Sequence, residues 1–192
     1  MRSLLIPAVL AAPALAGAQT SPAAPPRTPP AAGAADTAYA PRHQLRAGRE
    51  LVAYLVGASW CRPSNSPRVV AALRRAPVLL ARHASAQGAG FSATGVALDW
   101  ETDKGMGYLG QLGPLDEAVV GRNWLNAAAV DRIWRDPATK PSTPQVIVVE
   151  QDVALGERIS VSPPRVVLRV VGGDSIPAWV ARGAPLPPAP PR

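Results

Sequence analysis

The residue of this chain best suited to nucleophilic chemistry is its single cysteine, Cys61. It lies in the segment Trp60-Cys61-Arg62-Pro63-Ser64, directly after an apolar run and directly before a predicted helix. A thiol at a helix N-terminus faces unpaired backbone N–H groups and the positive end of the helix dipole, which both favour the thiolate. Arg62 adds a neighbouring positive charge. Because the thiolate is the nucleophile in thiol–disulfide exchange, Cys61 is a candidate for attack on a disulfide.

The presence of only one cysteine also limits the chemistry. No intrachain disulfide can form, so we expect the fold to depend on its apolar core. One cysteine with His43 and His83 does not supply four ligands at a spacing typical of structural zinc, and we predict no metal and no cofactor. We expect both histidines, and the carboxylates of Asp99, Glu101 and Asp103, to be solvated.

The elements that would position Cys61 follow from the hydrophobic pattern. The apolar run 51–56 ends at Gly57 and predicts a strand that is buried on both faces. After the cysteine segment, Ser66 is a candidate N-cap and Pro67 a candidate first helical residue. We expect Pro77 to kink or end this helix. Cys61 would therefore lie in a strand-to-helix connection, about one turn ahead of the helix.

A second strand is predicted over residues 91–99, with Val96, Leu98 and Trp100 on one face. A right-handed crossover through the intervening helix would make the first two strands parallel. The region 105–136 is predicted to be mainly helical.

Within that region, Pro114 is expected to open a helix with Asp116 and Glu117 in its first turn, where the dipole favours negative charge. Apolar residues at near-helical spacing predict a core stripe: Trp124, Leu125, Ala128, Ile133 and Trp134.

The last part of the chain predicts a β-hairpin and a final helix. The segment Thr143-Pro144 leads into a clear strand over 145–149, and Gly156 predicts a turn. The remaining predicted elements are strands over 158–161 and 166–171 and a short helix over 176–180. A hairpin added to two parallel strands gives a mixed sheet.

Taken in this order, the features resemble the thioredoxin superfamily. In that family the motif Trp-Cys-x-Pro-Cys follows a buried strand, and a cis-proline before a later strand lies beside the sulfurs. Trp60-Cys61-Arg62-Pro63-Ser64 and Thr143-Pro144 match those places, over roughly residues 48–183. The resemblance implies an α/β, thioredoxin-like domain with a central mixed sheet flanked by helices and an inserted helical segment. It also implies that Trp60, Thr143 and Pro144 frame the substrate, with Pro144 cis.

The chain departs from the family pattern at two positions that matter for chemistry. Ser64 stands in place of the second cysteine, and Leu55 stands where many members have a buried aspartate. A hydroxyl cannot form the internal disulfide, so a dithiol cycle is closed to this chain alone. A monothiol exchange through Cys61 remains, with a disulfide-containing protein or a low-molecular-weight thiol such as glutathione as its partner.

An alternative function stays open on the same fold. Thioredoxin-like domains without redox cysteines can serve as non-enzymatic peptide- or protein-binding modules, and a lone cysteine is commonly a buried, inert residue. Blocking Cys61 would abolish thiol transfer under the first hypothesis and leave partner binding intact under the second.

The two ends of the chain predict export and tethering. Residues 1–18 have a charged start, an apolar run and the sequence Ala16-Gly17-Ala18, which is typical of a secretory signal peptide, although a disordered Ala/Pro leader is an alternative. We predict a Pro/Ala-rich linker over 19–41, the folded domain over 42–183 and a Pro-rich disordered tail over 184–192. The predicted location is periplasmic or secreted, with no transmembrane segment after signal cleavage.

The net charge of +7 does not indicate a nucleic-acid partner. Of the 20 cationic side chains, only Lys104 and Lys140 are lysines, in a chain rich in Ala, Pro and Gly. That composition is typical of a coding bias, and no recognised nucleic-acid motif accompanies it. We therefore predict no nucleic-acid binding.

Overall fold

The computed structural model of this protein describes residues 46–136 and 140–188. The predicted signal peptide, the predicted linker and His43 lie outside these residues. Within the two described ranges, no helix is long and apolar enough to cross a membrane.

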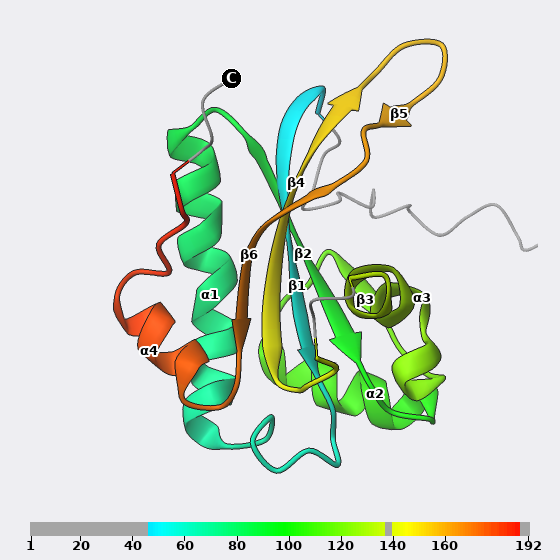
Figure 1. The fold of residues 1–192 in the computed structure, drawn as a ribbon, viewed down its shortest axis with the longest axis vertical. Helices are drawn as coiled ribbons and strands as arrows, with labels where there is room; N and C mark the ends of the chain where they lie inside the picture. The colour runs from blue at the N-terminus through cyan, green and yellow to red at the C-terminus, as the bar shows by residue number, and fades with distance from the viewer. Residues whose placement is uncertain (1–45, 137–139, 189–192) are drawn as a thin grey trace, which may run out of the picture. The chain divides into compact units, whose positions relative to one another are not determined.

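The described chain forms an α/β fold around a mixed, strongly twisted sheet (Figure 1). Its strands are β1 (Gly48–Gly57), β2 (Gly90–Ala97), β3 (Glu117–Val119), β4 (Gln145–Ala154), β5 (Ser160–Val161) and β6 (Arg165–Val171). They are ordered β3-β2-β1-β4-β5, and β6 also pairs with β4. The strands β1, β2 and β3 are parallel, β4 is antiparallel to β1, and β5 and β6 are antiparallel to β4. The predicted parallel pair and the mixed sheet are therefore confirmed.

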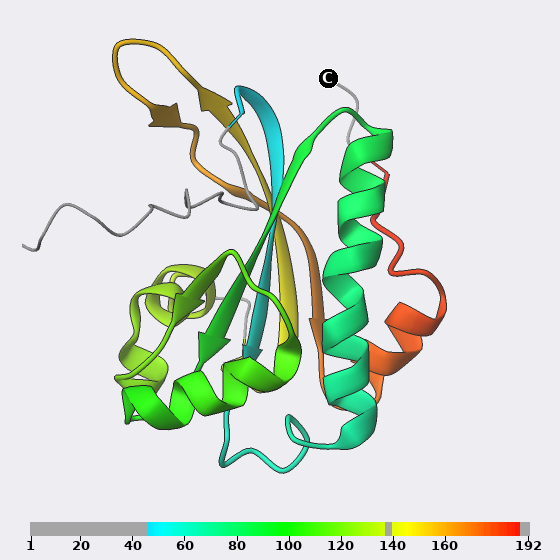
Figure 2. The same ribbon diagram turned by 180° about the vertical axis from the view of Figure 1, so that it is seen from behind.

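The helices lie on both sides of this sheet (Figures 1 and 2). They are α1 (Pro67–Ala86), α2 (Thr102–Leu109), α3 (Ala127–Ala129), which continues as a π-helical turn over Val130–Trp134, and α4 (Ser175–Ala181). The helices α1 and α4 pack together on one side of the sheet, and α3 lies on the other. Each side has its own cluster of buried apolar side chains.

Strand β1 feeds both clusters because successive side chains of a strand point to opposite faces. Leu51 and Leu55 belong to the cluster under α1, whereas Val52 and Val56 belong to the cluster under α3. All four are buried, as the continuous apolar run predicted. The strand is thus held from both sides, and the loop that follows it starts from a rigid base.

Helix α1 starts at the residue that the sequence predicts and continues past Pro77. Ser66 caps the helix, since its Oγ accepts a hydrogen bond from the backbone N–H of Val69 at 3.3 Å, and Pro67 is the first helical residue. We expected Pro77 to kink or end the helix, but it does not end it, because α1 runs continuously to Ala86. A proline removes one helical hydrogen bond, and here the fully buried Leu73 and Leu80 hold the helix on the sheet across that position.

The prediction of a helix opened by Pro114 was also wrong. Glu117 begins β3, which pairs with β2. The Asp116 carboxylate accepts a hydrogen bond from the backbone N–H of Ala93 at 2.8 Å, and Thr94 Oγ donates to the Glu117 carboxylate at 3.0 Å. The two acidic side chains that were expected to start a helix therefore hold a short edge strand against β2.

Only part of the predicted core stripe in 124–134 is buried. Ala128 and Ile133 are buried, whereas Leu125 and Trp134 are about half exposed. Trp134 instead packs edge-on against Trp124 and donates its indole N–H to the Trp124 carbonyl at 2.8 Å. The local switch from α- to π-helical turn changes which side chains share a face.

The first residues of the predicted disordered tail pack onto the fold. Ala184 is buried, and Leu186 packs against the cluster under α1. Trp179 of α4 donates its indole N–H to the Pro185 carbonyl at 3.0 Å, and a ring nitrogen of His83 lies 2.9 Å from the Gly183 carbonyl. His83, which was expected to be solvated, therefore contacts the backbone just before this segment.

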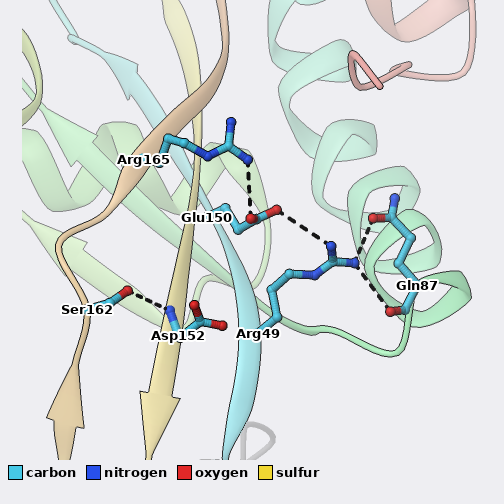
Figure 3. A network of polar contacts seen from close by, with 6 residues as sticks. All are labelled: Arg49, Gln87, Glu150, Asp152, Ser162 and Arg165. Carbon is cyan, nitrogen blue, oxygen red and sulfur yellow. Dashed lines mark hydrogen bonds and ion pairs between the residues drawn. The ribbon is translucent and has the colours of Figure 1, made fainter. Parts of the chain in front are cut away.

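A polar network joins the start of β1 to its neighbours (Figure 3). Arg49 donates to the Gln87 side chain at 2.8 Å, and its guanidinium lies 3.8 Å from the Glu150 carboxylate. Arg165 of β6 pairs with the other oxygen of Glu150 at 3.2 Å. Beside it, Ser162 Oγ accepts a hydrogen bond from the backbone N–H of Asp152 at 2.9 Å. This network fixes β1, β4, β6 and the end of α1 to one another at the end of the sheet remote from Cys61.

Candidate functional site

Cys61 lies in the loop between β1 and α1 and is only 7% exposed. Its backbone N–H donates to the Ala58 carbonyl at 3.3 Å, and its carbonyl accepts from the backbone N–H of Asn65 at 3.2 Å. These bonds form a turn that ends before Pro67, the first residue of α1. Cys61 is thus ahead of the helix and not in its first turn, which reduces the help that the helix dipole can give to a thiolate.

Asn65, which the sequence analysis did not single out, fixes this loop. Its side-chain amide nitrogen lies within hydrogen-bond distance of three backbone carbonyls, at 2.8 Å from Ala58, 3.0 Å from Ser59 and 2.8 Å from Cys61. An Asn in a loop just before a helix cap is a known signal for such local bonding to the backbone. The position of Cys61 is therefore set by a side chain four residues further on.

The fold brings Thr143 and Pro144 beside the cysteine, as the resemblance implies. The Thr143–Pro144 peptide bond is cis. The Cys61 thiol donates to the Thr143 carbonyl oxygen, with Sγ and O separated by 3.5 Å. Ser64, which is fully buried, places its Oγ 3.2 Å from the Thr143 hydroxyl. Thr143, which precedes β4, thus contacts both Cys61 and Ser64.

The other residues of the predicted site lie around the rim. Trp60 is 55% exposed, and its indole N–H donates to the Leu98 carbonyl at 2.7 Å. Arg62 and Pro63 are exposed, and a side chain added at Gly173 would contact Pro63. In the part of the chain that the structure describes, no ion pair of Arg62 is formed.

Asp99 was expected to be solvated, and this was wrong. It is 3% exposed, and its carboxylate accepts hydrogen bonds from both the backbone N–H and the hydroxyl of Ser59. The bonds join the end of β2 to the loop that holds Cys61. Glu101 and Asp103 are exposed. Among the described residues, no group of three or more His, Cys, Asp or Glu side chains is placed to hold a metal ion.

Trp100 was predicted to lie on one face of the second strand with Val96 and Leu98, and this was also wrong. Strand β2 ends at Ala97, and Trp100 beyond it is 68% exposed. Its carbonyl accepts a hydrogen bond from the backbone N–H of Arg122 at 3.4 Å. The chain has left the sheet at this point, so the alternation of faces no longer applies.

Tyr108 is a second residue near Cys61 that sequence reasoning missed. It is 1% exposed, and its hydroxyl faces Ser64 without a hydrogen bond of normal geometry. Burial raises the pKa of Tyr108 well above its ordinary value of 10.0, Ser64 lowers it in part, and the charges of Cys61 and Asp99 raise it further. No local pattern in the sequence signals this position.

The Tyr108 hydroxyl fits because Gly57 has no side chain. A Cβ added at Gly57 would overlap the phenol oxygen and ring of Tyr108. Gly57 is the last residue of β1, directly before the loop that carries Cys61. The glycine that was taken as the end of a strand therefore also makes room for a buried phenol.

A second polar region lies at the opposite end of β1. A cavity of about 250 Å³ is lined there by apolar and charged side chains, Leu51, Gln87, Glu150, Arg165, Val167, Leu186, Pro187 and Pro188. The carboxylate of Glu150, which lines this cavity, is already paired with Arg49 and Arg165 (Figure 3). The acid and the base among its described lining residues, Glu150 and Arg165, are therefore paired with each other.

The fold defines an α/β protein with a mixed, curled sheet. The single thiol of this protein lies in the connection between a strand and a helix. No protein-family model matches the sequence, and neither a curated protein nor a solved structure was found to match the chain.

Proposed function

We propose that this chain is a thioredoxin-like protein that performs monothiol thiol–disulfide exchange through Cys61. The arrangement of its strands supports the fold assignment. The strands β2, β1, β4 and β6 are neighbours in that order, with β1 and β2 joined through α1 and with β4 and β6 antiparallel. Helix α4 follows β6. This order is consistent with the strand–helix–strand unit, the β-hairpin and the final helix that the resemblance implies, with the short β5 between β4 and β6.

The observation that carries the proposal is the contact between the Cys61 loop and the segment Thr143-Pro144. The Cys61 sulfur lies 3.5 Å from the carbonyl oxygen of Thr143, which precedes a cis proline. Residues far apart in the sequence therefore meet at the only thiol of the chain. Ser64, at the place of a second cysteine, meets the same threonine at 3.2 Å.

The exchange itself needs a second thiol from outside the chain. The Cys61 thiolate attacks one sulfur of a disulfide, the S–S bond breaks, and the leaving thiolate takes a proton from water. A low-molecular-weight thiol then attacks the substrate sulfur of the mixed disulfide, which releases Cys61 as a thiolate and leaves the small thiol bonded to the substrate. A second molecule of the small thiol displaces the remaining substrate sulfur, so that two small thiols are oxidised to their disulfide and the substrate disulfide is reduced to two thiols. Since Cys61 is 7% exposed, the attack requires its thiol to become more accessible than it is in this structure.

The predicted signal peptide and linker add a location to this proposal. Residues 1–18 would direct the protein to the periplasm or outside the cell, where disulfides persist and are substrates for exchange. The partner is then a disulfide-containing protein or a small thiol, and no nucleic acid is involved.

A non-enzymatic binding module is the second candidate, and one observation favours it. The thiol of Cys61 is nearly buried and already donates to a backbone carbonyl, as a structural cysteine does. Trp60, next to Cys61 in the chain, and Trp100, next to the Asp99 that bonds to Ser59, are 55% and 68% exposed and offer apolar surface to a partner.

Reaction of the mature, folded protein with glutathione disulfide decides between the two. Because Cys61 is the only thiol, a glutathione adduct found by mass spectrometry reports on that residue alone. We expect an adduct on the native protein, its removal by reduced glutathione, and no adduct on Cys61→Ser. If the adduct forms only after unfolding in urea, the exchange function is wrong and the binding module is the better interpretation.

A further inference from the structure

We infer that Tyr108 is a positioning residue for Cys61 that acts through the hydroxyl of Ser64. The inference rests on the proposed exchange function and adds to it a hydrogen-bond donor that the sequence motif does not contain. It concerns the form of the site in which Cys61 is a thiolate.

The starting point is an unpaired buried hydroxyl. Among buried side-chain nitrogen and oxygen atoms of residues 46–136 and 140–188, the Tyr108 hydroxyl alone has no hydrogen-bond partner. Burying such a group without a partner opposes folding, and a phenylalanine would fill the same space without that cost. Stability alone therefore does not account for a tyrosine here.

The surroundings of this hydroxyl direct it toward the cysteine. It packs over Gly57, the residue that begins the connection to Cys61, and it faces the fully buried Ser64. Ser64 and Cys61 are both within bonding distance of Thr143, at 3.2 Å and 3.5 Å. Ser64 therefore lies near both the phenol and the threonine that the thiol contacts.

Tyr108 acts when the Cys61 thiol loses its proton, because the thiolate then needs a hydrogen-bond donor. When the thiol loses its proton to water, its bond to the Thr143 carbonyl is lost and the sulfur needs a donor. Rotation of the Ser64 hydroxyl away from Thr143 supplies that donor and leaves the Ser64 oxygen free to accept from Tyr108. Neither Ser64 nor Tyr108 gives up its proton. The thiolate is thus stabilised by a hydrogen bond that the phenol polarises.

The charges around Tyr108 are consistent with a neutral donor. The titratable groups that act on its hydroxyl are Cys61 and Asp99, and both disfavour a phenolate. Asp99 is itself bonded to Ser59 and does not accept from Tyr108. The phenol therefore keeps its proton over the whole range in which a thiol titrates.

The test is the pH dependence of Cys61 alkylation by iodoacetamide in the folded protein. For Tyr108→Phe we expect the rate at neutral pH to fall roughly tenfold, the size of one hydrogen bond to a charged group, with the same limiting rate at high pH. Ser64→Ala should give the same shift, and the double variant should add nothing, because the two side chains act in series. Tyr54→Phe is the matched control, since its hydroxyl bonds to Arg132 and not to the site.

The outcomes separate the inference from the function on which it rests. If native Cys61 reacts and the profile of Tyr108→Phe equals that of the unchanged protein, the role of Tyr108 is wrong and exchange stands. If native Cys61 does not react although unfolded protein does, both are wrong. Urea unfolding of each variant excludes loss of folding as the cause, and if Tyr108→Phe does not fold, Ser64→Ala alone decides.

Discussion

The two ends of strand β1 hold their polar side chains in opposite ways. At its start, Arg49, Glu150 and Arg165 are charged, partly exposed and paired with one another (Figure 3). At its end, Cys61, Ser64 and Tyr108 are uncharged or weakly acidic and buried. The first group satisfies its own hydrogen bonds, whereas the second leaves one hydroxyl without a partner.

This difference separates a structural network from a candidate site. Exposed ion pairs contribute little to stability and need no further role to persist. A buried hydroxyl without a partner lowers the free energy of unfolding, so its presence calls for a role outside stability. The loop after β1, which holds Cys61, is therefore the candidate functional site. Substitutions at the Arg49 end of β1 serve as controls for substitutions near Cys61.

The largest change should follow Ser64→Cys, which would alter the kind of chemistry at the Cys61 end. Because Cys61 and Ser64 share one turn, closed by the bond from the Asn65 N–H to the Cys61 carbonyl, their separation should suit a disulfide, which spans about 4.4–6.8 Å between Cα atoms. We expect treatment with glutathione disulfide to leave an internal disulfide with no glutathione attached. Thiol titration and mass spectrometry measure this, and a persistent adduct at Cys61 would contradict it.

Gly57→Ala should produce the next largest effect, now on stability. The added methyl group would overlap Tyr108 in a packed core, and we expect a loss of about 1–3 kcal/mol in the free energy of unfolding. Urea denaturation followed by fluorescence measures it. Gly107→Ala on α2 is the control, because a Cβ there meets nothing and should stabilise the helix by roughly 0.5–1 kcal/mol. Equal effects of the two changes would mean that Tyr108 does not pack on Gly57.

A smaller effect is expected from Tyr108→Phe at alkaline pH. Burial raises the pKa of Tyr108 in the folded protein above its ordinary value of 10.0, so above about that pH the unfolded chain releases its proton first. The folded state then binds more protons than the unfolded state, and stability falls as pH rises. The variant should lose stability less steeply between pH 9 and about 11. Identical slopes would show that this phenol does not ionise on unfolding in that range.

Glu150→Gln should have the smallest effect, which completes the comparison. It removes the carboxylate shared by Arg49 and Arg165, and we expect a loss of about 0.5–1 kcal/mol that shrinks at high salt. Urea denaturation at low and high salt measures it, with Glu157→Gln on the exposed hairpin as a control. Alkylation of Cys61 should be unchanged, and a change in its rate would show that the two ends of β1 are coupled.

The local sequence was sufficient for the elements whose pattern repeats over many residues. The continuous apolar run of β1, the cap and proline at the start of α1, and the strands after Pro144 each carry their signal within one segment. The loop sequence from Trp60 to Ser64 and the Thr143-Pro144 pair also identified the segments that meet. Their assignment to the thioredoxin superfamily stays a prediction.

The sequence could not decide the features that depend on contacts between distant segments. Pro77 remains inside a helix because buried neighbours hold both halves on the sheet, and the segment at Glu117 becomes a strand because the edge of β2 is open to it. Asp99 is buried and bonded to Ser59, which comes to it from the loop after β1. In each case local propensity favoured a different outcome and tertiary contacts overrode it.

Within the candidate site, the same division holds. The sequence by itself determined that one thiol and no second cysteine are present, and so which exchange cycle is open to the chain. Only the tertiary structure decided that the thiol is nearly buried, that it bonds to Thr143, and that the hydroxyl of Tyr108 lies behind Ser64. Side chains from separate elements set those contacts, and because no local pattern encodes the distance between elements, they become visible only when the chain is packed.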